Sequence, residues 1–451
     1  MHWKEGSGKD NIILRYHNSR YPKTTTGTTN RKAEIDHMTE ERRSNALEVL
    51  RIPEYRNFIT ARFFYIMALR MVTTIVGWRI YEITHNPFAI GLIGLSEFLP
   101  AFILALYAGH IIDKSDKRSL LITTTICYGV CVAGLITISA GPVMRSLSGH
   151  WIQWITYAII FTTGVIRAFA GPTLSAIIAQ IVPREQLPSA VTLNTSAFLT
   201  ASVIGHATGG FLIASTTYLA SFCVVGLYVC IALYFLSTMT PKKIMVSNSE
   251  KKTWESIMDG LRFVYRTREV VGAMALDLFA VLFGGAVAMI PVYARDILRI
   301  GPIGFGWLNA ASDIGSLTTM LSLTLYPLRR RQGLILQYAV AGFGACIILF
   351  GLSRWYLLSM IALLFSGMLD GISVVIRGTI LQLKTPDAMR GRVSSVNSMF
   401  INSSNELGQF ESGVMARLLG VVPSVVFGGC MTMGIVIATW FGAPSLRKME
   451  Y

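Results

Sequence analysis

Long apolar runs separated by short polar stretches dominate this chain. The runs are about 20 residues or longer, which is the length at which an α-helix crosses the hydrocarbon of a bilayer. Their apolar residues are not amphipathically spaced, unlike those of surface helices in soluble proteins. The pattern predicts twelve transmembrane helices, at about 57–82, 88–112, 119–139, 152–180, 189–213, 215–238, 270–293, 303–327, 332–353, 355–382, 393–418 and 422–442.

The two halves of this pattern repeat. Adding 215 to a residue number in the first two helices gives a like residue: Pro87 and Pro302, Gly91 and Gly306. Adding 203 does the same in the fourth and fifth helices: Asn194 and Asn397, Gly210 and Gly413. A constant offset indicates an internal duplication. The sequence therefore predicts an all-α integral membrane fold, with two pseudo-symmetric six-helix bundles.

Polar segments divide the chain. Residues 1–50 and 443–451 are predicted to be cytoplasmic tails, the first of them disordered. The bundles then occupy 51–238 and 270–442, with a cytoplasmic linker at 239–269. Apolar residues recur at helical spacing in this linker, which predicts an amphipathic helix on the membrane surface: Trp254, Ile257, Met258, Leu261 and Val264.

Composition and charge support the membrane assignment. The chain is 52% hydrophobic and 14% charged, and its mean hydropathy is +0.52. Its net charge of +15 does not indicate a nucleic-acid partner, because the basic residues gather in loops on one side. That side is predicted to be the cytoplasm and to hold both termini. Phosphate-loop and hydrolase motifs are absent and the cysteines lack metal-ligand spacing, so we expect no enzyme activity, cofactor or metal.

Charges inside the predicted helices are informative, because an ionisable group at mid-bilayer costs at least about 2.5–3.5 kcal/mol. Arg167 in the fourth helix corresponds to Asp370 in the tenth, and Arg62 in the first corresponds to Asp277 in the seventh. Each pair places opposite charges at equivalent positions. Arg167 and Asp370 could meet across a central cavity when one side of the protein closes. Alternatively, each charge is neutralised within its own half and only joins helices.

Two further arginines lie in the predicted helices. Arg70 is near the middle of the first helix. Arg377 follows Asp370 by seven residues, about 10.5 Å along the helix axis, so we expect it to bind another partner. A cavity lined by Arg70, Arg167 and Arg377 would suit an anionic or metal-free chelator-like substrate. Alternatively, these arginines are structural, which we favour for Arg377.

The eleventh helix carries a polar stripe. Its members follow one another by four, three, four and three residues, which places them on one helix face: Ser398, Asn402, Asn405, Gln409 and Ser412. Such a face avoids lipid, and it either lines a cavity or forms hydrogen bonds between helices. Glu406 flanks the stripe and is predicted to line the cavity. With Asp277 and Asp370, it is a candidate proton carrier.

A dense cluster of charges follows the second helix. Residues 109–118 read GHIIDKSDKR, between two membrane-crossing segments, so this turn must lie at a membrane surface. We expect Gly109 to allow close approach of a neighbouring helix. The charged residues of the turn are Asp113, Lys114, Lys117 and Arg118. The loop either sets topology alone, or it acts as a gate whose charges bind a neighbouring helix end.

This loop resembles the signature loop of the major facilitator superfamily, G-x-x-x-D-R/K-x-x-K/R-K/R, with Asp116 where Gly is usual. Three segments resemble the siderophore and macrolide exporters of the drug-efflux type: GLIGLSEFLPAFILALYAGHIID (91–113), LDLFAVLFGGAVAMIPVYARDIL (276–298) and LDGISVVIRGTILQLKTPDAMRGRVSSVNSMFINSSNELG (369–408). The last is most similar to the enterobactin-exporter branch. The resemblance covers about 49–442 and implies proton-driven efflux across a bacterial inner membrane.

These observations predict a secondary active transporter that exports a small siderophore- or drug-like molecule by alternating access. Its partners would be the substrate, protons and the lipid bilayer, and we expect a monomer. Two alternatives remain open. One is an uptake permease of the same fold, and the other is a membrane scaffold or sensor that transports nothing.

Overall fold

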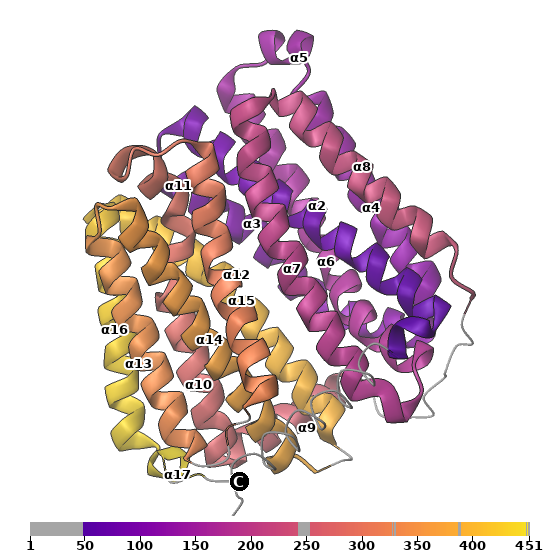
Figure 1. Ribbon diagram of the computed structural model, residues 1–451, viewed down its shortest axis with the longest axis vertical. Helices are drawn as coiled ribbons and strands as arrows, with labels where there is room; N and C mark the ends of the chain where they lie inside the picture. Colours follow the sequence, from indigo (N-terminus) through magenta and orange to yellow (C-terminus); the bar gives the residue numbers. More distant parts are fainter. Residues whose placement is uncertain are drawn as a thin grey trace, which may run out of the picture. The chain divides into compact units, whose positions relative to one another are not determined.

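The computed structural model describes residues 48–241, 253–326, 328, 331–386, 389–447 and 449. Within these ranges, twelve long helical segments occupy the predicted positions (Figure 1). Those of the first half are α2 (Pro53–Thr84), α3 (Pro87–Lys114), α4 (Lys117–Thr137), α6 (Gly149–Ile181), α7 (Leu187–Ser215) and α8 (Tyr218–Ser237). Those of the second half begin with α10 (Arg268–Phe283) and continue with α12 (Pro302–Leu325), α13 (Gln332–Leu352), α14 (Tyr356–Lys384), α15 (Arg390–Leu419) and α16 (Val421–Gly442).

Short helices mark the two ends of this arrangement. α5 (Gly141–Ser146) joins α4 to α6, and we call its side the α5 end. α9 (Thr253–Arg266) and α17 (Pro444–Arg447) lie at the opposite side, the α9 end (Figure 1). Two 3-10 turns, at Val49–Arg51 and Arg184–Gln186, precede α2 and α7.

The repeat found in the sequence is also a repeat of helix ends. Adding 215 to both bounds of α4 gives the bounds of α13. Adding 203 to the bounds of α7 gives those of α15 within one residue. The chain is therefore built of two equivalent six-helix bundles. The domain boundaries at 51, 238, 270 and 442 stay a prediction.

Two equivalent pairs of helices join the halves. α3 packs against α15, and α7 packs against α12. Glycines allow backbone contact in both pairs: a Cβ on Gly91 would lie 3.0 Å from Gly413 Cα, and a Cβ on Gly210 would lie 2.7 Å from Gly306 Cα. The repeat relates Gly91 to Gly306 and Gly413 to Gly210. The same close contact is thus made twice, and small residues permit it.

These contacts lie toward the α5 end, where further side chains join the halves. The rings of Trp78 and Phe305 are 5.2 Å apart, and the Tyr81 hydroxyl donates a hydrogen bond to Asp296. In Figure 1 the axes of α7 and α12 diverge toward the α9 end. The described contacts between the halves therefore favour one side of the molecule.

The helices that join the halves include the least apolar ones. Ten of the described helices are long and apolar enough to cross a membrane by length and composition, and α12 and α15 are not among them. Both pack against the opposite half. A helix face covered by protein does not contact lipid, so it tolerates polar residues such as Asp313 and Glu406.

The seventh predicted span is present as a helical segment at Glu269–Ile297, but it is a regular α-helix only as far as Phe283. A 3-10 turn (Gly285–Met289), α11 (Ile290–Val292) and a π turn (Tyr293–Ile297) follow α10. A Cβ on Gly285 would lie 2.5 Å from the carbonyl oxygen of Gly408, so α15 packs directly on this backbone. The Gly284–Gly285 pair and Pro291 weaken a regular helix here. The equivalent residues of α2 are Leu69 and Arg70, and α2 is continuous.

The linker contains the predicted helix, α9, and the described end of its apolar face packs against protein. Val264 is buried in a cluster with Val270 and Val393, and Leu261 packs against that cluster. A Cβ on Gly260 would lie 3.1 Å from the carbonyl oxygen of Arg392 on α15. The side chains of Trp254 and Ile257, like the tails at 1–47 and 450–451, lie outside the described residues.

Candidate functional site

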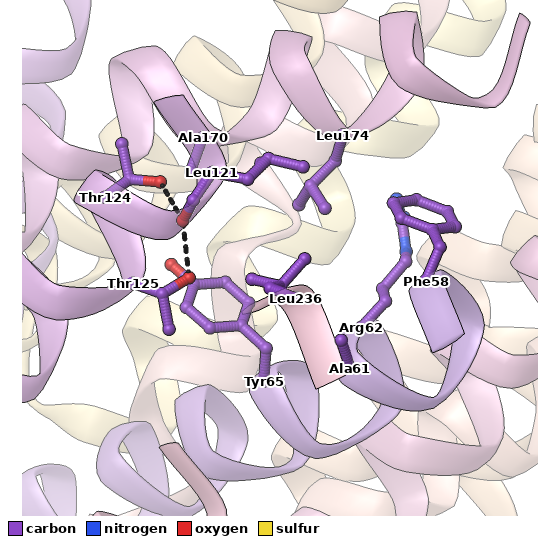
Figure 2. A pocket seen from close by; sticks show the side chains of 10 residues that line it. All are labelled: Phe58, Ala61, Arg62, Tyr65, Leu121, Thr124, Thr125, Ala170, Leu174 and Leu236. Carbon is purple, nitrogen blue, oxygen red and sulfur yellow. Dashed lines mark hydrogen bonds between the residues drawn. The ribbon is translucent and has the colours of Figure 1, made fainter. Parts of the chain in front are cut away.

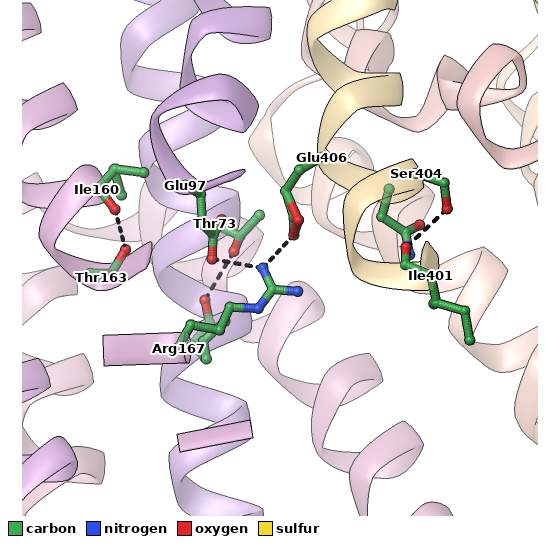
Figure 3. Close-up of polar contacts among 10 residues, drawn as sticks. Thr73, Glu97, Ile160, Thr163, Arg167, Ile401, Ser404 and Glu406 are labelled. Atoms are coloured by element: carbon green, nitrogen blue, oxygen red, sulfur yellow. Dashed lines mark hydrogen bonds and ion pairs between the residues drawn. The ribbon is translucent and has the colours of Figure 1, made fainter. Parts of the chain in front are cut away.

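An ion-pair network lies about halfway along α3, α6 and α15 (Figure 3). Arg167 on α6 places Nη1 2.8 Å from Glu97 Oε1 on α3 and also forms an ion pair with Glu406 on α15. The Glu406 side chain is 6% exposed, whereas that of Arg167 is 36% exposed. Because α15 belongs to the second half, Arg167 and Glu406 join the two bundles through charge.

Glycines bring these carboxylates within reach of Arg167. A Cβ on Gly164, three residues before Arg167, would lie 2.4 Å from the carbonyl oxygen of Glu97. A Cβ on Gly94, three residues before Glu97, would lie 2.9 Å from the carbonyl oxygen of Glu406. α3 therefore lies in backbone contact with both α6 and α15, and the three charged side chains converge where these helices meet.

The expected pair of Arg167 with Asp370 is not formed in this structure. Glu97 and Glu406 satisfy Arg167, and Asp370 lies on α14 at a cavity enclosed by its own half. Among the described residues, Asp370 forms no ion pair. The repeat identifies equivalent positions, and equivalent positions in two bundles need not face each other, so a meeting of Arg167 and Asp370 in another conformation stays a prediction.

A second ion pair lies inside the second half. Arg377 on α14 binds Asp277 on α10, and their side chains are only 3% and 8% exposed. Arg377 thus has a carboxylate partner other than Asp370, as we expected. Since both partners belong to one bundle and are buried, this pair joins α10 to α14. It does not place Arg377 in an open cavity between the halves.

Arg62 and Arg70 lie over one aromatic ring. Their guanidinium carbons are 5.9 and 5.5 Å from the centroid of the Phe198 ring on α7. Within the described part of the chain, neither arginine forms an ion pair. Arg62 also lines a small cavity in the first half, beside Tyr65 (Figure 2). Arg70 is partly exposed and is one of the arginines that we expected to line a cavity.

A second polar cluster lies at the contact between α7 and α12. The Ser202 hydroxyl on α7 donates a hydrogen bond to Asp313 on α12, and His206 Nε2 lies 3.7 Å from Asp313 Oδ2. His206 Nδ1 is 2.7 Å from the Thr74 hydroxyl on α2. This cluster joins the halves at the α7–α12 contact, which is equivalent to the α3–α15 contact. The repeat contained a signal, because Asp313 is one position away from the equivalent of Glu97.

The polar stripe of α15 divides into two parts. Ser398, Asn402 and Asn405 are exposed, and they lie toward the α9 end. Gln409 packs against Gly94, where a Cβ would lie 2.8 Å from Gln409 Cβ, and Ser412 is buried beside Gly285. One part of the stripe therefore remains accessible, and the other serves close packing between helices.

The charged turn between α3 and α4 has partners within the first half. Lys117 donates to the carbonyl oxygen of Ile112, and Arg118 Nη2 donates to that of Ser237 at 2.6 Å. Ser237 ends α8, so a basic side chain binds a helix C-terminus. Asp116 caps α4 by accepting from the Ser119 amide at 2.9 Å, and Lys114 is exposed.

Two expectations for this turn have different outcomes. A Cβ on Gly109 would meet nothing within 4 Å among the described residues, so the predicted close approach of a helix is wrong for this conformation. Asp113 lies near the end of α3, but its side chain is outside the described residues. Its role in gating stays a prediction.

Comparison with known proteins adds independent information. The family model described as transmembrane secretion effector matches residues 44–450. The enterobactin exporter EntS of Shigella boydii serotype 18 (strain CDC 3083-94 / BS512) is 23% identical over 377 residues, covering 84% of this chain and 88% of the relative. A D-xylose-proton symporter structure, 15% identical, has a TM-score of 0.67 and covers 88% of this chain and 98% of its own. The nucleoside transporter NupG, 12% identical, has a TM-score of 0.63 and covers 88% and 100%.

The solved structures share the fold at low sequence identity, and the fold does not by itself establish a function. The family match, however, spans both bundles, and the family consists of transporters rather than enzymes. It agrees with the charged turn, the repeat and the contacts between the halves. The chain is a multi-pass membrane protein that belongs to the transmembrane secretion effector family of major facilitator superfamily transporters.

Proposed function

We propose that this protein is a proton-driven exporter of a small, siderophore- or drug-like organic molecule, and that it works by alternating access as a monomer. The similarity to an enterobactin exporter supports both the direction and the substrate class. We place it in a bacterial inner membrane with the α9 end and both termini in the cytoplasm. The basic residues at that end, among them Lys114, Arg118 and Arg390, support this orientation.

The ion pair between Arg167 and Glu406 is the observation that carries the proposal. For the α5 end to open, the halves must separate there, and α15 must move away from α6. Glu406, whose side chain is only 6% exposed, would lose its partner, which costs about 3–5 kcal/mol by analogy with broken buried pairs, while Arg167 would keep Glu97. A charged cargo group and a proton can replace the lost partners. An anionic group would take the place of Glu406 at Arg167, and a proton would neutralise the Glu406 carboxylate.

Other side chains favour an anionic cargo. Arg70 forms no ion pair with the described residues and lies over the Phe198 ring, so a bound anion could pair with its guanidinium. The exposed amides of Asn402 and Asn405 offer hydrogen bonds along α15. Asp277, Asp370 and Glu406 are the proposed proton carriers. Asp277 and Glu406 each have an arginine partner, and Asp370 has none in the described chain.

The direct test uses purified protein in inside-out vesicles with an acidic lumen and enterobactin as the probe. Export predicts that enterobactin accumulates in the lumen while protons leave it, and that dissipating the pH gradient stops accumulation. Accumulation only with the reversed gradient would mean uptake. The absence of exchange for enterobactin and for a panel of drug-like molecules would favour the scaffold or sensor. A reporter fused after Tyr451 should be cytoplasmic.

A further inference from the structure

The two halves end differently at the α9 end. By the offset of 215, Arg118 at the start of α4 is equivalent to Gly333 at the start of α13. By the offset of 203, Ser237 at the end of α8 is equivalent to Trp440 near the end of α16. Arg118 Nη2 donates to the carbonyl oxygen of Ser237, so a cation caps a helix of its own half. The equivalent glycine has no side chain that could do the same.

The C-terminal segment fills the space beside Gly333. A Cβ on this glycine would overlap the carbonyl oxygen of Leu446, and its amide donates to the Met449 carbonyl oxygen at 3.3 Å. The Leu446 side chain is fully buried, in one cluster with Val270. α17 therefore docks against the ends of α10, α13 and α16 (Figure 1). Docking at Leu446 and Met449 fixes the position of Arg447 between them.

Arg447 completes a stack of three side chains, with Trp440 and Tyr338, that we call the tail cluster. Its guanidinium carbon is 4.9 Å from the centroid of the Trp440 ring, and that ring is 6.2 Å from the ring of Tyr338 on α13. Tyr338 is 61% exposed on a helix long and apolar enough to cross the membrane, so its ring faces lipid. Trp440 lies two residues before the end of α16. The tail cluster therefore lies at the boundary between lipid and water, the depth that Trp and Tyr prefer.

The tail cluster offers hydrogen-bond donors that the described protein does not use. Among the described residues, no carboxylate forms an ion pair with Arg447, and none accepts a hydrogen bond from the Trp440 indole N–H or the Tyr338 hydroxyl. A guanidinium binds phosphate oxygens through parallel N–H groups, and an indole or phenol can add a further bond. This donor set suits an anionic phosphate group.

Apolar surface next to the tail cluster indicates what carries the phosphate. Ile437 and Phe441 are four residues apart on α16, so they share a face, and they are 58% and 78% exposed. A free phosphate ion would leave this surface unused. A phospholipid would place its headgroup at Arg447 and an acyl chain along α16.

We propose that the tail cluster is a binding site for an anionic phospholipid of the leaflet at the α9 end. The site belongs to the second half alone, because Thr123 and Ser237 occupy the places of Tyr338 and Trp440 in the first half. It is complete only while the C-terminal segment is docked, since that segment supplies Arg447. Lipid binding at this site depends on neither the proposed cargo nor the direction of transport.

The test compares two lipids with the same acyl chains, phosphatidylglycerol and phosphatidylcholine, by native mass spectrometry of the purified full-length protein in detergent. The site predicts that one phosphatidylglycerol molecule binds about fivefold to tenfold more tightly than phosphatidylcholine. Arg447→Gln should remove this preference and leave thermal unfolding without added lipid nearly unchanged. Equal binding of both lipids by the wild type would overturn the proposal, since the rings would then only anchor the protein in the interface. A preference retained by Arg447→Gln would overturn it as well.

Two further variants separate the tail cluster from the general effect of positive charge. Lys384→Gln removes an exposed cation from the same end of the same half and should keep the preference. Trp440→Leu keeps Arg447 but removes the ring beneath it, so the preference should fall by about twofold to fivefold. Loss of the preference in Lys384→Gln but not in Trp440→Leu would contradict the assignment.

Glycerol phosphate distinguishes a lipid from a free phosphate as the ligand. It carries the anionic group without acyl chains, so at equal concentration it should not displace phosphatidylglycerol. Displacement would overturn a phospholipid as the partner of the tail cluster. Since no cargo is used, any of these results leaves the exporter proposal standing.

Discussion

Arg167 and Asp370 occupy equivalent positions of α6 and α14, yet they carry opposite charges and have different surroundings. Arg167 binds an acid of its own half, Glu97, and an acid of the other half, Glu406. Asp370 lines a cavity within its own bundle and forms no ion pair with the described residues. Duplication has preserved the helix positions and allowed the chemistry to diverge. Of the two equivalent residues, Arg167 thus joins the bundles through charge, whereas Asp370 faces only its own bundle.

Asp277 and Arg62 are the other equivalent pair with opposite charges. A substitution at Asp277 should have the largest effect on stability. Asp277→Asn leaves Arg377 buried without a counter-charge, which should destabilise the protein by about 3–5 kcal/mol. The yield of folded protein in the membrane and thermal unfolding in detergent would both fall. Arg62→Gln is the matched control, because Arg62 has no ion pair in the described chain, and it should change stability far less. Equal losses for the two variants would contradict the difference between the halves.

The cross-half pair predicts a loss of transport with coupled energetics. Arg167→Gln leaves the buried Glu406 without its partner and should lower the export rate at least about tenfold, and Glu406→Gln, which leaves Arg167 paired with Glu97 alone, should lower it less. The double variant should lose less than the product of the single losses, with a coupling energy of about 0.5–3 kcal/mol. The coupling energy is obtained from the rates of enterobactin export in proteoliposomes, corrected for the amount of protein.

A second double-mutant cycle, between Arg167 and Asp370, is the control for this test. Arg167→Gln combined with Asp370→Asn should behave additively, within about 0.5 kcal/mol, because these residues do not pair. Strong coupling between Arg167 and Asp370 would mean that they meet in another conformation, and it would restore the pairing expected from the sequence.

Both halves make the same close glycine contact, Gly91 with Gly413 and Gly306 with Gly210. A substitution at one of these glycines therefore disturbs one of the two equivalent contacts. Gly306→Val places a side chain where a Cβ would already lie 2.7 Å from the His206 carbonyl oxygen. This should shift the protein toward a state that is open at the α5 end. Spin labels at Asn86 and Arg299, in a cysteine-free background, should move apart. Gly434→Val, where a Cβ meets nothing within 4 Å, is the control and should leave the distance unchanged.

The acid of the charged turn after α3 exists in one half only, because Leu328 occupies the position equivalent to Asp113, while the basic residues recur as Arg329, Arg330 and Arg331. Asp113→Asn should reduce export severalfold while changing the free energy of unfolding by less than about 1 kcal/mol, since this turn lies at the surface. Lys114→Gln, at an exposed neighbour, should have little effect on either measurement. Normal export by Asp113→Asn would leave topology as the only role of the turn.

Much of the architecture could be predicted because its causes are local. Runs of apolar residues longer than a bilayer's hydrocarbon thickness predict the helices, and the offsets of 215 and 203 reproduce helix ends such as those of α4 and α13. The break after α10 was missed, although Gly284, Gly285 and Pro291 were visible signals. Composition identified the membrane-crossing segment. The regular α-helix within it is interrupted where Gly408 packs against Gly285.

The site was predicted less completely, because partner choice depends on distances across helices. Arg167, Glu406, Asp277 and Arg377 were all singled out as costly charges, and the structure assigns each a partner. The expected pair of Arg167 with Asp370 is not formed in this conformation, since equivalence in a repeat describes a rotation and not a contact. The place of Asp313 follows from the repeat, since it is one position from the equivalent of Glu97, whereas its partner Ser202 is visible only in the structure.

The sequence by itself determined the number of helices, the duplication and which residues carry a charge into the membrane. These properties depend on chain-local quantities, namely hydropathy over a helix length and the spacing between like residues. Only the tertiary structure decided which charges pair, that Ser373 is buried without a described partner beside two aspartates, and that the polar helices α12 and α15 pack against the opposite half. Those properties depend on how closely separate helices approach, and backbone contacts at glycines such as Gly94, Gly164 and Gly408 set that approach.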